Sequence, residues 1–305
     1  MRKFLAIAAI ALLPLTAGNS SIAKRTHFRL PVSSDADDVE KQAFKVSLDG
    51  VDSKILRVRG PDEDVVLLIV LDLTGDVAQI EAVRQSLNES LHALPPNAWA
   101  AVLRAQDGVK VLADPSNDRE KTIAAIAESP TTGKAGFLEA VETVSRIADS
   151  MLAKSAARVA TLYITDSSVS GYREDFTNPV INSSDSRDLS RVFGEGLIVE
   201  KVRKVEAAIA GSEAPLFFVH LEYRADQLNE AYQGGMLQLA SRTGGAGVFC
   251  RSLADIPGAV KKTLATARSH WSVDVDLAKA KNRAVQVQVE NGSRTLLYPS
   301  RIQVR

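Results

Sequence analysis

The sequence of 305 residues holds a single cysteine, Cys250, so no disulfide can form within the chain. Cys250 follows two apolar residues, which indicates a buried thiol in a strand rather than a reactive one. The four histidines lie far apart, and none has the spacing of a zinc site. These scarcities exclude a disulfide scaffold and a histidine-based metal motif.

Net charge is also lacking, because 37 Lys and Arg residues balance 37 Asp and Glu residues. A balanced chain has no field of one sign that would steer it to nucleic acid or to anionic lipid. Hydrophobic residues make up 45% of the chain and charged residues 24%, which is typical of a packed globular protein. We therefore expect a folded protein that binds no nucleic acid.

Long apolar runs are missing beyond the N-terminus, so we expect no transmembrane segment in the mature chain. The N-terminus is typical of a secretory signal peptide. Arg2 and Lys3 precede an apolar run over residues 4–15, and residues 21–23 have the small-x-small form of a cleavage site. No cysteine near this point would accept a lipid. We predict a signal peptide over residues 1–23 and an exported protein, either periplasmic or secreted.

Residues 62–270 have the pattern of one α/β domain. Residues 65–71 are seven apolar residues in a row, which is typical of a strand buried on both faces of a parallel sheet. Further strands are expected at 99–105, 109–113, 159–165, 216–221 and 247–250, and helices at about 80–94, 116–128, 137–151, 195–210, 228–239 and 255–268. This alternation predicts a doubly wound, mostly parallel sheet with helices on both faces.

The two flanking segments, residues 24–61 and 271–305, differ from the centre. Polar and acidic residues indicate a flexible leader over 24–43, and two short strands follow it before residue 61. The C-terminal segment alternates apolar and polar residues and contains a hairpin signal at residues 291–292. Each segment offers too few strands for a stable sheet. We predict that they pair as one small antiparallel β subdomain.

Polar residues follow the buried strands, at the sheet edge where ligands bind in open α/β folds. Oxygen-bearing side chains and small residues gather there: Asp72, Thr74, Gly75, Asp76, Thr132, Gly133, Asp166 and Ser167. Carboxylates and a hydroxyl on one rim could hold a hard divalent cation such as Mg²⁺, which uses one or two carboxylates and keeps waters.

At these residues the chain resembles the von Willebrand factor type A family, and in particular its exported, acidobacterial-type branch. That family builds a metal-ion-dependent adhesion site from an Asp-x-Ser-x-Ser motif, a loop Thr and a later Asp. Asp72 matches the first Asp, and Thr74 and Asp76 stand at the two serine positions. Asp166, with Ser167 in place of a glycine, matches the later Asp. The resemblance implies a protein-binding module with Asp72, Thr74, Asp76 and Asp166 as ligands of Mg²⁺ or another divalent cation.

Two positions depart from the family pattern. Ala135 stands where the loop Thr is expected and has no oxygen for a metal, and Asp76 adds a charge where the family has a hydroxyl. Two interpretations are open. Either the rim binds its ligand through a metal ion, or the metal site has been lost and the acids cap helices instead. Without a metal, crowding of Asp72, Asp76 and Asp166 should raise at least one pKa.

The segment 167–194 is polar, long and without a clear period, and it leaves the strand end at Asp166. Tyr172 and Arg173 lie in it, and such residues are favoured at protein interfaces. A solvated insertion is the other interpretation. We predict these contacts with a ligand or partner: Gly75, Thr132, Gly133, Ser167, Tyr172 and Arg173.

The function favoured by these patterns is an exported adhesion or assembly module that binds a protein, rather than an enzyme. One alternative is a metal-free structural component of an exported assembly, and a second is a hydrolase that uses Asp72 and Asp76 as paired carboxylates. A phosphate loop is disfavoured because Glu128 stands at its first glycine position and Ala135 at its Ser/Thr position. No Gly-x-Ser-x-Gly elbow occurs.

Overall fold

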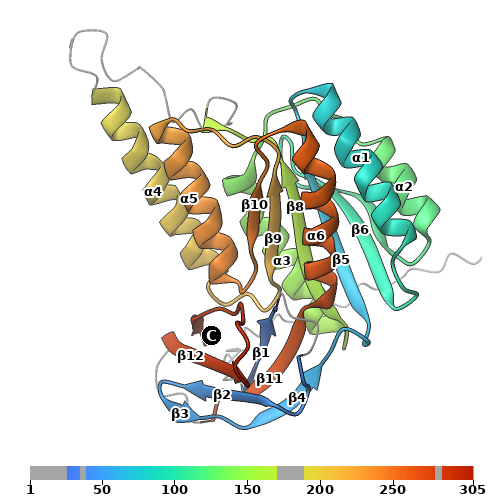
Figure 1. Ribbon diagram of the computed structural model, residues 1–305. Coiled ribbons are helices and arrows are strands. Elements are labelled where there is room, and N and C mark those ends of the chain that lie inside the picture. Colours follow the sequence, from blue (N-terminus) through green and yellow to red (C-terminus); the bar gives the residue numbers. More distant parts are fainter. Residues whose placement is uncertain (1–25, 35–38, 170–188, 279–283, 305) are drawn as a thin grey trace, which may run out of the picture.

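The computed structural model describes residues 26–34, 39–169, 189–278 and 284–304. Its centre is a six-stranded sheet with the order β10-β9-β8-β5-β6-β7 (Figure 1). Five strands are parallel, and only the edge strand β7 is antiparallel to its neighbour. The strands are β5 (Val65–Asp72), β6 (Ala98–Arg104), β7 (Lys110–Ser116), β8 (Arg158–Thr165), β9 (Leu216–His220) and β10 (Gly247–Phe249). The predicted doubly wound sheet is confirmed.

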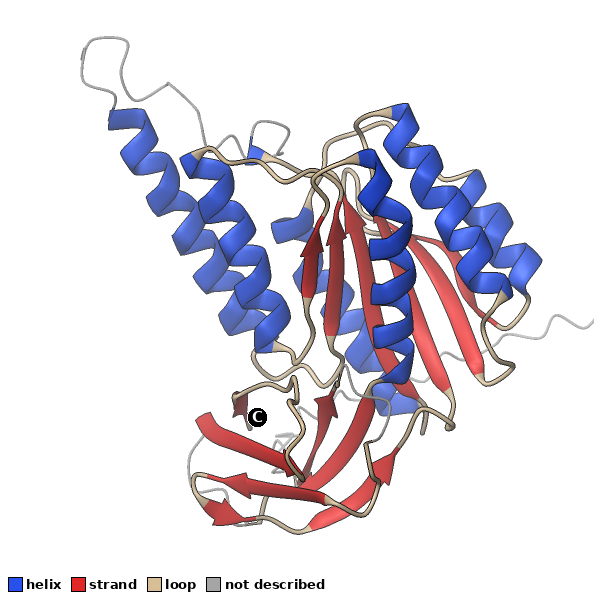
Figure 2. Ribbon diagram, viewed as in Figure 1, coloured by secondary structure: helices blue, strands red, loops and turns tan. Residues whose placement is uncertain are grey.

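Three helices cover each face of this sheet (Figure 2). One face carries α1 (Val77–His92), α2 (Arg119–Ala127) and α6 (Ile256–Ser269), and the other carries α3 (Phe137–Lys154), α4 (Leu189–Ile209) and α5 (Gln227–Arg242). Leu67 and Ile69 of β5 pack with the first set, whereas Leu68 and Val70 pack with the second. Burial on both faces is the reason for the continuous apolar run. Helix α4 begins before residue 195, where the helix was predicted to start.

A β sandwich lies below the sheet, beside the amino ends of the parallel strands (Figure 1). One layer has the order β1-β11-β4, and the other has the order β13-β12-β2-β3. The strands are β1 (His27–Val32), β2 (Phe44–Leu48), β3 (Val51–Asp52), β4 (Ile55–Arg59), β11 (Trp271–Asp276), β12 (Ala284–Asn291) and β13 (Arg301–Gln303). Side chains from both chain ends share one core. The predicted pairing of the two flanking segments is confirmed.

Two local predictions for these flanks are wrong. The expected flexible leader contains strand β1, in which Phe28 and Leu30 are fully buried and the backbone pairs with β11. The expected two-residue hairpin at residues 291–292 is a longer connection, because Leu297 first bridges to Ser33 of the other layer. Both errors have one cause: local patterns do not record pairing with strands far away in the sequence.

Arg158 joins the sandwich to the sheet. Its side chain is fully buried at the start of β8 and donates hydrogen bonds to four carbonyl oxygens, those of Pro61, Glu63, Arg268 and His270, at 2.5–3.1 Å. Pro61 and Glu63 lie between β4 and β5, Arg268 lies in the last turn of α6, and His270 lies between α6 and β11. Burial lowers the pKa of Arg158 to about 10. Arg158 thus fastens the sandwich to the amino edge of the sheet.

None of the helices in the described ranges combines the length and apolar character that a bilayer span requires.

Candidate functional site

Asp72, the last residue of β5, is fully buried under the carboxyl edge of the sheet. The Gly136 amide donates to both of its oxygens at 3.2 Å, and the hydroxyls of Thr165 and Tyr163 donate at 3.0 and 3.3 Å. Burial raises the pKa of Asp72 to about 7, although these donors act in the opposite direction. The carboxylate thus ties β8 and the start of α3 to the end of β5.

Asp166 lies one residue beyond β8 and holds the loop that follows β5. Its Oδ2 accepts hydrogen bonds from the Thr74 amide at 2.7 Å and from the Gly75 amide, and its Oδ1 accepts one from the Thr74 hydroxyl at 3.3 Å. A Cβ at Gly75 would lie 2.8 Å from Oδ2, so the approach requires glycine. Burial raises the pKa of Asp166. The structure therefore brings Asp72, Thr74 and Asp166 together at the carboxyl edge of the sheet.

Asp76 takes a different role. Its side chain is exposed and accepts a hydrogen bond from the Ala78 amide at 2.6 Å, as the N-cap of α1. Asp is among the preferred N-cap residues because its oxygen satisfies an unpaired amide of the first turn. The carboxylate is thus engaged by the helix and not by the rim.

The loop before α3 is held by Asp107, a residue whose role the sequence did not reveal. Asp107 Oδ1 accepts a hydrogen bond from the Lys134 amide at 3.3 Å, and Gly133 adopts a φ of +116° beside it. A Cβ on Gly133 would lie 2.3 Å from Asp107 Oδ2. Thr132 and Gly133 are exposed on the rim, whereas Ala135 is buried. The partner of Asp107 is set by tertiary contact, so no local pattern in the sequence reveals it.

A second polar group lies beneath the rim, around Ser167. The Ser167 and Tyr232 hydroxyls are 3.0 Å apart, and His220 Nε2 lies 2.6 Å from the Ser167 carbonyl oxygen. Burial lowers the pKa of His220 and raises that of Tyr232. Ser167 is buried, so its side chain does not face a partner in this conformation. Tyr172 and Arg173, the other predicted contacts, lie outside the described residues.

The donor set does not fit a divalent cation of the predicted kind. The oxygens of Asp72 and Asp166 already accept protein hydrogen bonds, Asp76 caps α1, and Ala135 offers no oxygen. Over the described ranges, no three side chains of His, Cys, Asp or Glu are grouped to hold a metal ion. A cation here would have to displace hydrogen bonds that position both loops.

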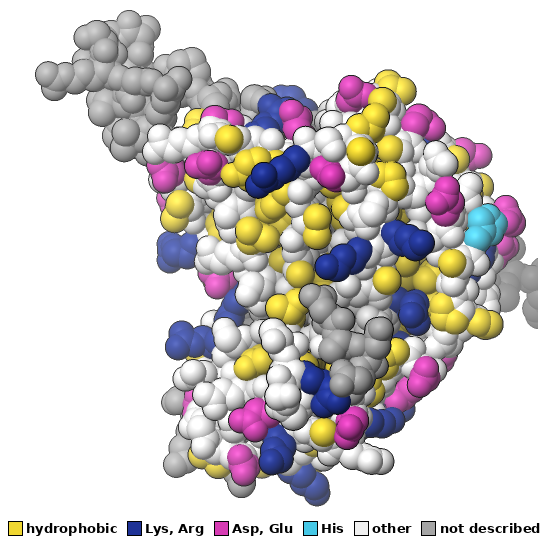
Figure 3. All heavy atoms as spheres, viewed as in Figure 1, with side chains coloured by type: hydrophobic (Ala, Val, Ile, Leu, Met, Phe, Trp, Pro, Cys, Tyr) yellow, Lys and Arg dark blue, Asp and Glu magenta, His cyan; other side chains and the backbone are white. Residues whose placement is uncertain are grey.

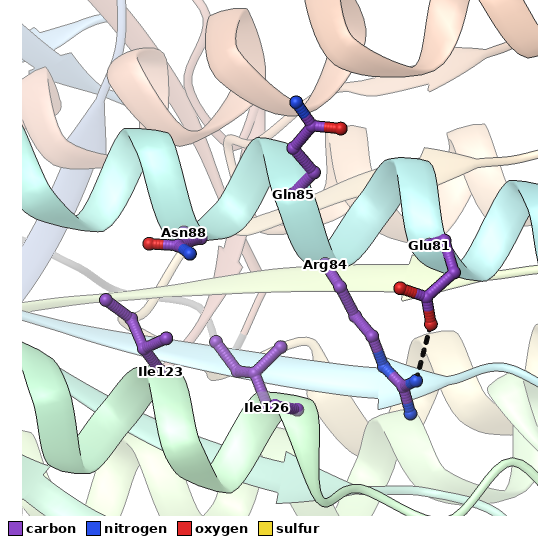
Figure 4. Close-up of a pocket in the computed structure, with 7 residues that line it drawn as sticks. Glu81, Arg84, Gln85, Asn88, Ile123 and Ile126 are labelled. Atoms are coloured by element: carbon purple, nitrogen blue, oxygen red, sulfur yellow. Dashed lines mark hydrogen bonds and ion pairs between the residues drawn. The ribbon is translucent and has the colours of Figure 1, made fainter.

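A groove lies between α1 and α2 (Figure 4). It measures about 280 Å³ and is lined by Glu81, Arg84, Gln85, Asn88, Ile123, Ile126 and Ala127. Arg84 is engaged twice, by Glu81 at 2.7 Å and by the Ser129 carbonyl at 2.9 Å. Because the Arg84 guanidinium is already bound by Glu81 and by the Ser129 carbonyl, it offers no unpaired charge to a ligand in this groove.

No family model matches the sequence, and no curated protein does either. Solved structures of similar fold include the von Willebrand factor type A protein from Catenulispora acidiphila, with 10% identity, a TM-score of 0.48, and coverage of 93% of this chain and 74% of that one. The ArnB paralog VWA2 from Sulfolobus acidocaldarius gives 11% identity, a TM-score of 0.46, and coverage of 92% and 76%.

A third similar structure is proximal thread matrix protein 1 from the mussel byssus, described with a zinc-occupied MIDAS motif. Its identity is 9%, its TM-score 0.42, and the coverage 68% of this chain and 48% of that one. The solved structures similar to this chain thus include von Willebrand factor type A domains. Similarities this low carry no argument about function, so the chain's own geometry must supply it.

Proposed function

We propose that this chain is a protein-binding module of the adhesion or assembly type. Its contact face is the carboxyl edge of the central sheet, and its rim works without a bound metal. The supporting observation is the Asp166 carboxylate, which the amides of Thr74 and Gly75 enclose. That contact gives the rim loops a fixed shape by hydrogen bonds alone. A fixed loop surface on a rigid scaffold is well suited to recognition, because little ordering entropy is lost on binding.

The metal-assisted version is the second candidate, because Asp72, Thr74 and Asp166 do lie together. Mg²⁺, Mn²⁺ and Zn²⁺ are titrated calorimetrically into the wild-type chain and into Asp72→Ala. We expect no heat of binding and no change in melting temperature on addition of EDTA. Stoichiometric binding by the wild type that is lost in Asp72→Ala would establish the metal site and overturn the metal-free rim.

The contact face is tested by photo-crosslinking. A benzophenone amino acid is placed at the exposed rim position Thr132, and at Lys54 of the sandwich as a matched exposed control. The proteins of the producing cell envelope serve as prey. We expect one dominant crosslinked protein from Thr132 and none from Lys54. Crosslinks from Lys54 alone would favour the alternative, a structural component that joins an assembly through its β subdomain.

The geometry gives weaker support to the alternative that this chain is a hydrolase. A catalytic base must reach a substrate proton at hydrogen-bond distance, but Asp72 is fully buried and Asp76 caps a helix. The two carboxylates therefore do not face a shared opening. Turnover on a panel of ester, peptide and glycoside substrates that disappears in Asp166→Asn would favour the enzyme.

Export is also part of the proposal, and it depends on the signal-peptide pattern of residues 1–23. N-terminal sequencing of the protein purified from its native cell tests it. A mature chain that begins just after residue 23 is expected, and a chain that retains Met1 contradicts it.

A further inference from the structure

The carboxyl edge has a second polar surface, at the far end from Asp72, where β9 and β10 finish. Tyr223 follows β9, and its amide donates to the Cys250 carbonyl at 2.8 Å. Its ring meets the Phe249 ring edge to face, with centroids 6.1 Å apart at 73°, and Phe249 packs in turn on Phe218. Tyr223 is nevertheless 38% exposed. An aromatic ring fixed on one side and open on the other is typical of an interface anchor.

Arg251 lies over this ring, with its guanidinium carbon 5.5 Å from the Tyr223 ring centroid. The backbone beneath it is fixed, because Asp255 Oδ2 accepts hydrogen bonds from the amides of Arg251 and Ser252 at 3.0 and 2.9 Å. The Ser252 hydroxyl completes a capping box. These bonds, together with the nearby Arg251 charge, lower the pKa of Asp255, but the carboxylate forms no ion pair with the guanidinium. The cation is held in place at low entropic cost.

The acids nearest to Arg251 and Tyr223 in sequence, Asp255 and Glu222, have hydrogen-bond partners other than the Arg251 guanidinium. Glu222, the acid nearest in sequence to Tyr223, forms its ion pair with Arg224 at 2.8 Å. Among the residues that the structure describes, Arg251 forms no ion pair, and its side chain is exposed. An Arg on an aromatic ring keeps its planar donors directed outward, and these match the two oxygens of a carboxylate.

Apolar surface lies beside the cation. Leu253 is 48% exposed in the short helix η3 (Leu253–Asp255), and Val77 is 72% exposed at the start of α1, which contacts η3. Figure 3 shows Lys and Arg side chains interspersed with hydrophobic ones on the face of the molecule seen in that view. A cation with an exposed leucine and an exposed valine on the neighbouring elements η3 and α1 is complementary to an acidic side chain next to an apolar one.

We propose that Arg251, on its Tyr223 platform, binds the carboxylate of an acidic peptide segment of a partner protein, while Leu253 and Val77 contact an apolar residue beside it. This assignment rests on the proposed protein-binding function and names the chemistry of the partner. Strand β10 is two strands from β8, so the site lies about 10 Å along the edge from Asp166. In this assignment, Arg251 gives the carboxyl edge of the sheet the positive charge that a bound metal ion would otherwise supply.

The test screens the full wild-type chain against short random peptides displayed on phage, and the enriched peptides are then synthesised. We expect enrichment of Asp or Glu next to Leu, Phe or Met. Binding of such a peptide should weaken at least about tenfold in Arg251→Gln, which removes a charge-assisted hydrogen bond. It should weaken equally when the peptide Glu is replaced by Gln, and it should decline with added salt.

Arg203→Gln is the matched control, because Arg203 is an exposed cation on α4, away from this edge. It should bind as the wild type does. Tyr223→Leu keeps apolar bulk but removes the platform, and we expect a smaller loss. Circular dichroism melting confirms that each variant is folded. Peptides that bind Arg251→Gln and wild type equally, or that lack acids, overturn this assignment, while the crosslinking experiment at Thr132 tests the binding function separately.

Discussion

The two edges of the central sheet use buried charge in different ways. At the amino edge, Arg158 donates to four carbonyls and fastens the sandwich onto the sheet. At the carboxyl edge, Asp72 and Asp166 accept hydrogen bonds from loops of the same domain, and nothing in the described chain covers these loops from above. Buried charge therefore joins two units at one edge and shapes an open surface at the other. The predictions below test this difference, from the largest expected effect to the smallest.

Replacement of Arg158 by Met should give the largest loss. The change removes a buried guanidinium and leaves four carbonyls without their donors, which destabilises by about 3–5 kcal/mol. Urea unfolding followed by circular dichroism measures the free energy of unfolding. Arg203→Met, at an exposed position, is the control and should change it by less than about 0.5 kcal/mol. A small effect of Arg158→Met would mean that the sandwich does not depend on this contact.

The second prediction concerns pH. The pKa of Asp72 is raised to about 7 in the folded chain from an ordinary value near 3.8, so the folded state binds a proton more tightly than the unfolded state. Stability from this group is complete below about pH 4, falls as the pH rises to about 7, and is constant above it. The difference in unfolding free energy between wild type and Asp72→Asn should follow this curve. A difference independent of pH would contradict a buried Asp72 carboxyl with a raised pKa.

Gly75→Ala should have an intermediate effect. The added Cβ meets Asp166 Oδ2 at 2.8 Å and forces the carboxylate from the amides, which we expect to destabilise by about 1–3 kcal/mol. Gly234→Ala is the matched control, because no atom lies within 4 Å of its added Cβ and it sits inside α5. Alanine there should stabilise by roughly 0.5–1 kcal/mol. Thermal melting distinguishes the lower melting temperature expected for Gly75→Ala from the higher one expected for Gly234→Ala.

Asp76→Ala should have the smallest effect, a loss of about 1 kcal/mol from the missing N-cap of α1. Asp76→Ser, which retains a capping oxygen, should recover most of it. Chemical unfolding measures both variants. If Ala and Ser lower stability equally, the cap is not the role of this residue, and a rim role for Asp76 would regain support.

Much of the architecture was predictable. The run at residues 65–71 could only be a strand buried on both faces, and the alternation around it required helices on both sides. The pairing of the two flanks followed from the need for more strands than either one offers. Strand β1 was missed because Pro31 and charged neighbours obscure a short alternation that is apparent only once β11 lies beside it.

The location of the candidate site could be predicted from the sequence better than the role of each residue in it. Asp72, Thr74 and Asp166 meet at the carboxyl edge because parallel strands end there together. The capping role of Asp76 and the Asp107–Gly133 contact were not predictable, since each depends on the angle at which a loop leaves its strand. The Arg251–Tyr223 pair joins loops 28 positions apart in sequence, without a shared motif.

The sequence alone determined the doubly wound sheet, the existence of a β subdomain and the edge at which polar residues collect, because hydrophobic periodicity records which faces must be buried. The tertiary structure alone decided what those polar residues do. Whether a carboxylate faces a cation, a loop amide or a helix end depends on its partners in space. In this chain Asp72 and Asp166 accept hydrogen bonds from loop amides, Asp76 caps α1, and Arg251 lies exposed over the Tyr223 ring.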